Sequence, residues 1–343
     1  MSGGLPQRYR VYGLALGSEV PLLGVQRRDD QTAGLIRISC TAPPAGALRD
    51  LVCLHEAPGR GQVAEPPFSI LRSTSSGWTV WRWQDGITFS LSPDGRSVHA
   101  GLPAGETEAS LAYYLVGPIL AYLLRDRGVS LLHGSVVACG PDAVGFLGPS
   151  GAGKSTLAAA CVARGFTLVT DDLIALCEVG TSLGALPGYS GSRLWPDAAA
   201  ALLGPERELP RIVDTSAAWP GWDKRWWASP ARALSGPVRL SRIYLLQPDS
   251  DDHAHFQSMP KTEALIALDQ DAYQPFLRTE ECHRSDFAVF ARLAEQVPVK
   301  KLYVAASLAQ LGRVVDAVLR DLATPAPVPA ESTSARYPAR QAP

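Results

Sequence analysis

The chain has 343 residues, of which 46% are hydrophobic and 19% charged, and its formal net charge is -1. This length favours two domains plus a tail, with enough apolar residues for a sizeable core. A net charge so close to zero gives no overall electrostatic attraction to nucleic acids or anionic membranes, so neither partner is predicted.

Cysteine spacing and the N-terminal residues bear on whether the protein is secreted or stays in the cytoplasm. The six cysteines lie far apart without a Cys-x-x-Cys pair, and the first ten residues lack the apolar run of a signal peptide. The most apolar run, 111–124, is too short to cross a bilayer and contains Gly117-Pro118. We therefore expect a cytoplasmic protein in which this run is a buried helix.

Short strands dominate the first hundred residues. Apolar or alternating runs predict strands at 9–15, 35–40, 68–72, 78–83 and 87–91. The last two flank the turn Gln84-Asp85-Gly86, as in a hairpin. The sequence thus predicts a β-rich N-terminal domain at 1–104, followed at 105–128 by a connecting helix that Thr107 caps.

Strands alternate with helices in the rest of the chain. Strands are predicted at 130–137, 143–147, 167–170, 242–246 and 301–304, and helices at 154–164, 285–296 and 308–322. This pattern predicts an α/β catalytic domain at 129–323. Six aliphatic residues between Leu308 and Leu322 share one helical face, which favours core packing over partner docking. The tail at 324–343, rich in Pro, Ala and Ser, is expected to be disordered.

A phosphate-binding motif follows the strand predicted at 143–147. Residues 148–156, GPSGAGKST, fit the Walker A pattern between a strand and a helix. The glycines let backbone N–H groups turn toward phosphate oxygens, and the helix dipole adds a favourable field. ATP and Mg²⁺ are therefore the expected cofactors, with Lys154 on the β and γ phosphates, Ser155 on the metal and Thr156 on phosphate. The expected nucleotide-binding residues are Gly148, Ser150, Gly151, Ala152, Gly153, Lys154, Ser155 and Thr156.

Two adjacent carboxylates, Asp171 and Asp172, end the strand predicted at 167–170. A right-handed βαβ unit would place that strand beside the motif strand, so that both acids emerge next to the phosphates. One could then hold magnesium while the other accepts a proton from a substrate hydroxyl. Adjacent carboxylates are hard to tell apart from sequence, so the two roles can be exchanged.

Three segments together resemble the bacterial HPr serine kinase/phosphorylase family. They are LLHG at 131–134, the GPSGAGKST loop and RGFTLVTDD at 164–172, and the likeness is best over about 133–176. Residues 9–24 also look like the opening of HPr-kinase-related proteins, some of which phosphorylate the C-terminal serine of lasso peptides.

The resemblance implies a P-loop kinase fold and specific residue roles. It makes Asp171 the general base and Asp172 the magnesium partner, places His133 near the transferred phosphoryl group, and implies a serine acceptor on a peptide or protein. Two departures, Thr156 in place of Glu and residues 188–195 in place of Glu-Ile-Arg-Gly-Leu-Gly, argue against HPr as the substrate and against the reverse phosphorylase reaction.

Basic residues beyond the motif are further candidates. Lys224 and Arg225, in an aromatic and basic segment at 219–227, could contact phosphate or substrate, as could Arg193; loop packing is the alternative for them. His253, His255 and His283 lie near acids but lack a metal-ligand spacing, so we expect solvated loops there.

Rival nucleotide-binding classes fit less well. Gln247-Pro248 stands where a transporter-type ATPase needs Asp-Glu, and a chain without asparagine lacks the guanine-reading motif of GTPases. A small-molecule hydroxyl kinase is the main alternative, and a non-catalytic nucleotide sensor is a further one. The sequence also leaves open whether the chain forms a homo-oligomer.

Overall fold

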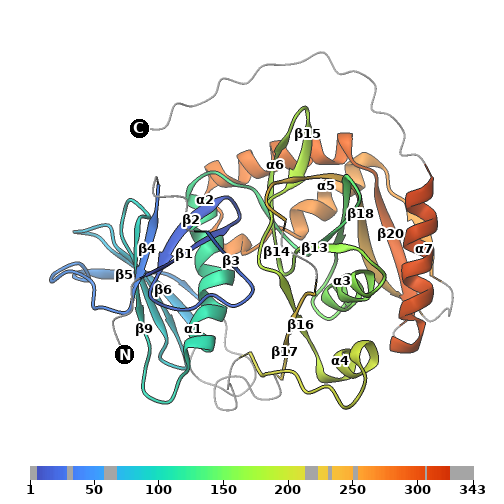
Figure 1. The fold of residues 1–343 in the computed structure, drawn as a ribbon. Coiled ribbons are helices and arrows are strands. Elements are labelled where there is room, and N and C mark those ends of the chain that lie inside the picture. Colours follow the sequence, from blue (N-terminus) through green and yellow to red (C-terminus); the bar gives the residue numbers. More distant parts are fainter. Residues whose placement is uncertain are drawn as a thin grey trace.

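The structure, a computed structural model, describes residues 6–28, 34–57, 68–212, 223–230, 234–249, 254–305 and 307–324. It is a mixed α/β protein with large sheets and a β-rich N-terminal region, as the sequence predicts (Figure 1). Apart from Thr324, the predicted disordered tail lies outside the described residues, and so do Trp219, Trp222 and His253.

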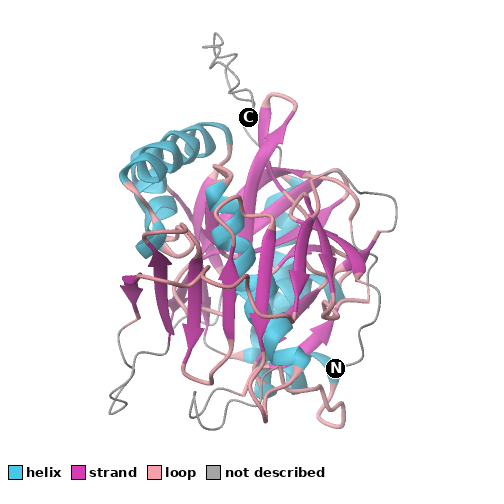
Figure 2. Ribbon diagram, turned by 90° about the vertical axis from the view of Figure 1, so that its left-hand side faces the viewer, coloured by secondary structure: helices cyan, strands magenta, loops and turns pink. Residues whose placement is uncertain are grey.

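Within the described residues, the N-terminal sheet has nine strands in the order β3-β1-β2-β4-β9-β8-β7-β6-β5. Figure 2 views the molecule from the side of this sheet. The strand predicted at 9–15 is in fact a hairpin, because Tyr12 and Gly13 both take a positive φ and turn the chain. The strands are β1 (Gln7–Val11), β2 (Leu14–Ser18), β3 (Gln26–Arg27), β4 (Ile36–Ser39), β5 (Leu51–Glu56), β6 (Phe68–Ser73), β7 (Thr79–Trp83), β8 (Thr88–Leu91) and β9 (Ser97–Gly101).

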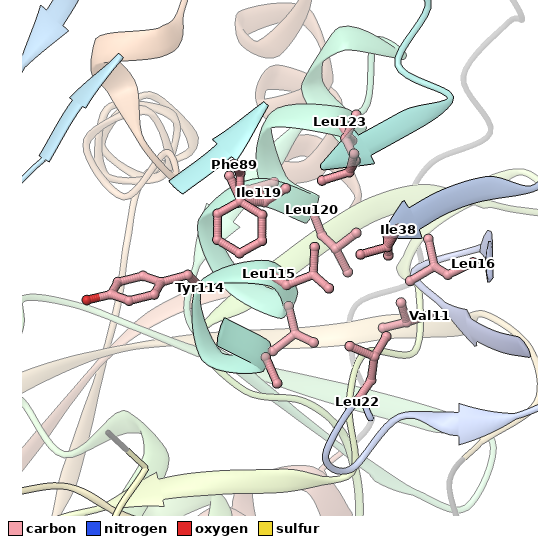
Figure 3. Close-up of a cluster of buried hydrophobic side chains, with 14 of the residues drawn as sticks. Val11, Leu16, Leu22, Ile38, Phe89, Tyr114, Leu115, Ile119, Leu120 and Leu123 are labelled. Atoms are coloured by element: carbon pink, nitrogen blue, oxygen red, sulfur yellow. The ribbon is translucent and has the colours of Figure 1, made fainter. Parts of the chain in front are cut away.

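A continuous helical segment packs on this sheet. It consists of α1 (Glu108–Tyr114), the π-helical turn η1 (Leu115–Ile119) and α2 (Leu120–Asp126). Thr107 caps it as predicted, since its Oγ1 accepts a hydrogen bond from the backbone N–H of Ser110 at 3.2 Å. Figure 3 shows aliphatic side chains of this segment interleaved with those of β1, β2 and β4. The predicted connecting helix is therefore also part of the N-terminal core.

A second large sheet carries the predicted motifs. Its main path within the described residues is β10-β14-β15-β18-β12-β11-β13, with β20 beside β18 and β19 beside β20, and β16 and β17 form a separate pair. The strands are β10 (Leu131–His133), β11 (Ser135–Cys139), β12 (Asp142–Leu147), β13 (Thr167–Thr170), β14 (Leu173–Val179), β15 (Ser182–Ala185), β16 (Gly191–Leu194), β17 (Arg225–Ala228), β18 (Val238–Asp249), β19 (His255–Ser258) and β20 (Val299–Ala305).

The strand predicted at 130–137 is broken at Gly134. A Cβ on Gly134 would lie 2.5 Å from the carbonyl oxygen of Phe146, so only glycine fits where the chain passes from β10 to β11. As a result β10 pairs with β14, while β11 pairs with β12 and β13.

The predicted neighbour of the motif strand was wrong. Strand β13 does not lie beside β12, because β11 forms an antiparallel hairpin with β12 and then pairs antiparallel with β13. Two antiparallel steps leave β12 and β13 running in the same direction, with β11 between them. Their carboxyl ends still meet the same edge of the sheet, which keeps both aspartates near the loop.

The predicted helices are present. They are α3 (Lys154–Ala163), α6 (Glu280–Gln296) and α7 (Leu311–Ala323), and the structure adds α4 (Pro196–Leu203) and α5 (Lys261–Gln270). Val315 and Val318 on α7 are fully buried against α3, which confirms the core packing of the aliphatic stripe. Among the described residues, no helix combines the length and apolarity that crossing a membrane requires.

Candidate functional site

A cavity of about 290 Å³ lies at the carboxyl ends of β12, β18 and β20. It brings most of the predicted site residues together, although they come from distant parts of the chain. Those that line it are His133, Ser150, Gly151, Ala152, Gly153, Lys154, Ser155, Thr156, Asp172, Arg193 and Lys224. Gly148, Asp171 and Arg225 are not among its lining residues.

The predicted strand, loop and helix frame the motif. Strand β12 ends at Leu147 and helix α3 begins at Lys154, with Gly153 as its N-cap in a left-handed conformation (φ 90°). Glycine is required at 148, where φ is 129° and a Cβ would lie 2.9 Å from the carbonyl oxygen of Leu246. No side chain caps the start of α3, so its first backbone N–H groups are left for an anionic ligand.

Lys154 folds back over the loop. Its Nζ donates to the carbonyl oxygens of Gly148 at 2.6 Å and Pro149 at 3.1 Å, and the residue is only 7% exposed. Burial lowers the pKa of Lys154. A phosphate would offer this ammonium group charged acceptors in place of two neutral carbonyls.

The two adjacent aspartates have different surroundings. Asp171 is fully buried, and its Oδ1 accepts from the Ser135 hydroxyl at 2.6 Å while its Oδ2 accepts from the backbone N–H of Arg193 at 3.2 Å. Asp172 has φ 71°, an uncommon value outside glycine, and its carboxylate lines the cavity. Both oxygens of Asp171 therefore have protein partners, and Asp171 does not line the cavity although Ser135 and Arg193 do.

Asp172 belongs to a charged cluster. Its Oδ2 accepts hydrogen bonds from Nη1 of Arg193 at 3.1 Å and from the Tyr273 hydroxyl at 3.2 Å. Burial alone would raise the pKa of Asp172, but the positive charge of Arg193 and the other partners outweigh it, so the pKa lies below its usual value. The carboxylate is therefore ionised at neutral pH.

His133 lines the cavity, and its two ring nitrogens have different roles. Its Nδ1 lies 3.0 Å from the backbone carbonyl oxygen of Asp172, and because a carbonyl only accepts, we assign the ring proton to Nδ1. Burial lowers the pKa of His133, more than the charge of Asp172 raises it. The imidazole is thus neutral, and its Nε2 can accept a hydrogen bond.

Tyrosines that the sequence did not single out surround Arg193. The guanidinium carbon lies 4.4 Å from the ring centre of Tyr113 and 5.4 Å from that of Tyr189. Gly117, in the π-helical turn, leaves room for this arrangement, since a Cβ there would lie 3.4 Å from Nη2 of Arg193. Arg193 is 7% exposed and is therefore held by stacking as well as by its ion pair with Asp172.

The N-terminal sheet also reaches the turn that bears the aspartates. The hydroxyl of Tyr12, in the β1–β2 hairpin, lies 3.1 Å from Oγ1 of Thr170, the residue before Asp171. The backbone N–H of Tyr12 donates to the carbonyl of Pro187 at 2.8 Å. The N-terminal half thereby supports the site without lining its cavity.

Asp271, directly after α5, is another residue that the sequence did not indicate. Its carboxylate accepts a hydrogen bond from the backbone N–H of Gly148, and its carbonyl oxygen accepts from the backbone N–H of His133 at 2.7 Å. Burial raises the pKa of Asp271 to about 6, against the opposing charge of Lys154. Asp271 therefore connects the loop at 148–153 to the strand that carries His133.

The raised pKa of Asp271 predicts a pH-dependent stability. In the unfolded chain this carboxyl titrates near its ordinary value of about 4. Between about pH 4 and pH 6 the folded protein then binds more protons than the unfolded chain, so this group makes the free energy of unfolding fall as the pH rises. Asp271→Asn keeps an acceptor for Gly148 but cannot ionise, so we expect it to be more stable than wild type above pH 6.

Urea unfolding at pH 4, 5, 6 and 7 checks this prediction. The two proteins should converge at pH 4, and Asp126→Asn, at an exposed position, should not reproduce the difference. Equal stability of Asp271→Asn and wild type at every pH would contradict the raised pKa.

The remaining candidates lie at the margin of the site or outside it. Lys224 lines the cavity, with its Nζ 5.8 Å from the ring centre of Trp195. Arg225 does not line the cavity and donates to Asp223 at 2.8 Å, and its role as a phosphate or substrate contact stays a prediction. His255 and His283 are about half exposed and lie near single aspartates, at 3.8 Å from Asp249 and 3.9 Å from Asp269.

Comparisons with known proteins show likeness only among solved structures, at low identity. No protein-family model and no curated protein matches the chain. Among solved structures, the chain is similar to the HPr(Ser) kinase/phosphatase from Coxiella burnetii, with a TM-score of 0.29 and 13% identity over 56% of this chain and 95% of that one. A likeness at this level does not assign a function, so we base the proposal below on the residues of the site.

Proposed function

We propose that this protein is an ATP- and Mg²⁺-dependent kinase that transfers the γ-phosphoryl group to a serine hydroxyl of a peptide or protein. One observation carries the proposal: the Walker A residues Lys154 and Ser155 line the same cavity as Asp172, His133 and Arg193. A phosphate cradle beside an ionised carboxylate, a neutral imidazole and a buried guanidinium supplies the groups that phosphoryl transfer needs.

The residues present fit a bound magnesium ion. The Ser155 hydroxyl and the Asp172 carboxylate both line the cavity, and both are hard oxygen ligands of the kind that Mg²⁺ prefers. Bound there, the ion would neutralise charge on the phosphates. Ser155 is its proposed protein ligand, because Walker A proteins bind Mg²⁺ through this hydroxyl.

The chain's own groups have the following proposed roles. Lys154 and the N–H groups at the start of α3 bind the phosphates of ATP. The serine oxygen forms a bond to the γ-phosphorus as the bond to the oxygen shared with the β-phosphate breaks, and ADP leaves. Asp172 takes the proton of the serine hydroxyl. The sequence resemblance implied this role for Asp171, but we assign it to Asp172 because Asp172 is the member of the pair that lines the cavity.

Two further groups position the reaction. The guanidinium of Arg193 holds the Asp172 carboxylate and adds positive charge where negative charge develops on the phosphoryl group. His133, through its Nε2, is placed to orient the acceptor hydroxyl. The serine of a peptide or protein, as the acceptor, rests on the sequence resemblance described above.

Labelling with radioactive ATP tests the acceptor. The purified protein with Mg²⁺ is offered HPr, precursor peptides that end in serine, and a metabolite extract, with Lys154→Ala as the control. We expect label on a serine of a peptide or protein other than HPr. Label found only on a metabolite would instead support the small-molecule kinase, and efficient labelling of HPr would show that the two departures from the family pattern do not exclude it.

A further inference from the structure

The cavity has two chemically different ends. The end described above carries Asp172, His133, Arg193 and Lys224. The other end is lined mainly by aliphatic side chains from β18, from the end of β20, from η3 (Leu308–Gln310) and from the start of α7, with Ser307 among them. The aliphatic residues are Leu246, Val304, Ala305, Leu308, Leu311 and Val314. The proposed phosphoryl transfer makes no use of this aliphatic end.

Sheet topology places the two ends on opposite sides of the phosphate loop. The loop leaves β12, and Asp172 follows β13, which lies two strands away on one side. Val304 and Ala305 end β20, which lies two strands away on the other side, and β12, β18 and β20 all run parallel. Neighbouring strands are about 4.8 Å apart, so each end begins about 10 Å from the loop strand.

The aliphatic end is both close to the loop and firmly built. The backbone of Gly148 packs so tightly on the carbonyl of Leu246 that a Cβ would not fit. Val314 of α7 and Leu157 of α3 belong to one buried core and both line the cavity. A ligand that occupies the loop can therefore extend into a preformed apolar space.

We propose that this aliphatic end binds the base and ribose of the nucleotide. The inference rests on the proposed function, which puts the phosphates in the loop and the γ-phosphate toward Asp172. The opposite end of a nucleoside triphosphate then points toward β20 and α7, where a flat apolar base removes aliphatic side chains from water.

Comparing ATP with inorganic tripolyphosphate tests this assignment, because tripolyphosphate has the phosphates but no base. We expect wild type to bind Mg-ATP on the order of 10-fold more tightly than Mg-tripolyphosphate. The double variant Leu308→Ala, Leu311→Ala should weaken ATP binding on the order of 10-fold and leave tripolyphosphate binding within about twofold. The matched control is Ile266→Ala with Phe287→Ala, two exposed apolar residues on α5 and α6.

A second variant guards against a folding defect. Ala305→Trp would fill the aliphatic end, so it should exclude ATP while tripolyphosphate still binds. If wild type binds both ligands equally, or if the variants weaken the binding of both to the same extent, the assignment of the base to the aliphatic end is wrong. The proposed phosphate site is then unaffected. If wild type binds neither ligand, the proposed function fails and this inference fails with it.

Discussion

Lys154→Ala should weaken the binding of Mg-ATP on the order of 100-fold, since the ammonium group makes charge-assisted contacts to two phosphates in the proposed complex. The variant should remain folded. In the free protein Nζ donates hydrogen bonds to the carbonyls of Gly148 and Pro149, so its removal breaks no hydrogen bond to a carboxylate, although Asp271 loses a nearby positive charge.

Isothermal titration with Mg-ATP measures the loss directly. Lys261→Ala is the matched control, because Lys261 lies on the surface of α5 with its side chain 62% exposed. Unchanged affinity in Lys154→Ala would remove the phosphate site and, with it, the kinase proposal.

Asp172→Asn should lower phosphoryl transfer by about 10²- to 10⁴-fold while nucleotide affinity stays within a few-fold of wild type. An amide keeps the shape of the carboxyl group but cannot accept the serine proton. Asparagine also tolerates the left-handed backbone at this position, where φ is 71°, so the turn should survive the change. Single-turnover transfer at saturating ATP is the measurement.

Asp171→Asn is expected to behave differently. One carboxylate oxygen accepts from Ser135 and the other from the backbone N–H of Arg193. An amide has one accepting oxygen for these two donors, so the Ser135 hydroxyl would have to turn and accept from the NH₂ group instead. We expect a loss of about 1–3 kcal/mol in the free energy of unfolding, with transfer retained by the folded protein.

Two outcomes would overturn this division of roles. Loss of transfer in Asp171→Asn without loss of stability, together with normal transfer in Asp172→Asn, would restore the role that the sequence resemblance implies for Asp171. If high magnesium restored the transfer rate of Asp172→Asn, Asp172 would instead be the metal ligand, as the sequence resemblance implies.

Local determinants explain what the sequence predicted well. Glycines at special backbone angles, an apolar strand before them and a helix after them are all set within about twenty residues, so the loop and α3 follow from pattern alone. The cap at Thr107 and the buried stripe of α7 are local in the same sense.

The rest depends on contacts between distant segments. The insertion of β11 between β12 and β13 is a choice of pairing that no local pattern fixes. Asp271 reaches Gly148 from more than a hundred residues away, and Tyr113 and Tyr189 reach Arg193 from separate elements. Which of Asp171 and Asp172 meets the cavity depends on the turn around Asp172, with its φ of 71°, and on the partners that bury Asp171.

One buried cluster joins the N-terminal sheet to the half of the chain that bears the site. It runs from Val11 and Ile38 through Leu115 to Leu173 and Tyr273, and Arg125 of α2 is paired with Asp286 of α6 at 2.9 Å with both side chains almost fully buried. A continuous hydrophobic core thus crosses the domain boundary that the sequence predicts near residue 128. A protein built this way does not offer its N-terminal half as an interchangeable module. Replacing that half would strip apolar surface from the half that holds residues 148–156, so changes to either half have to be accommodated within an intact whole.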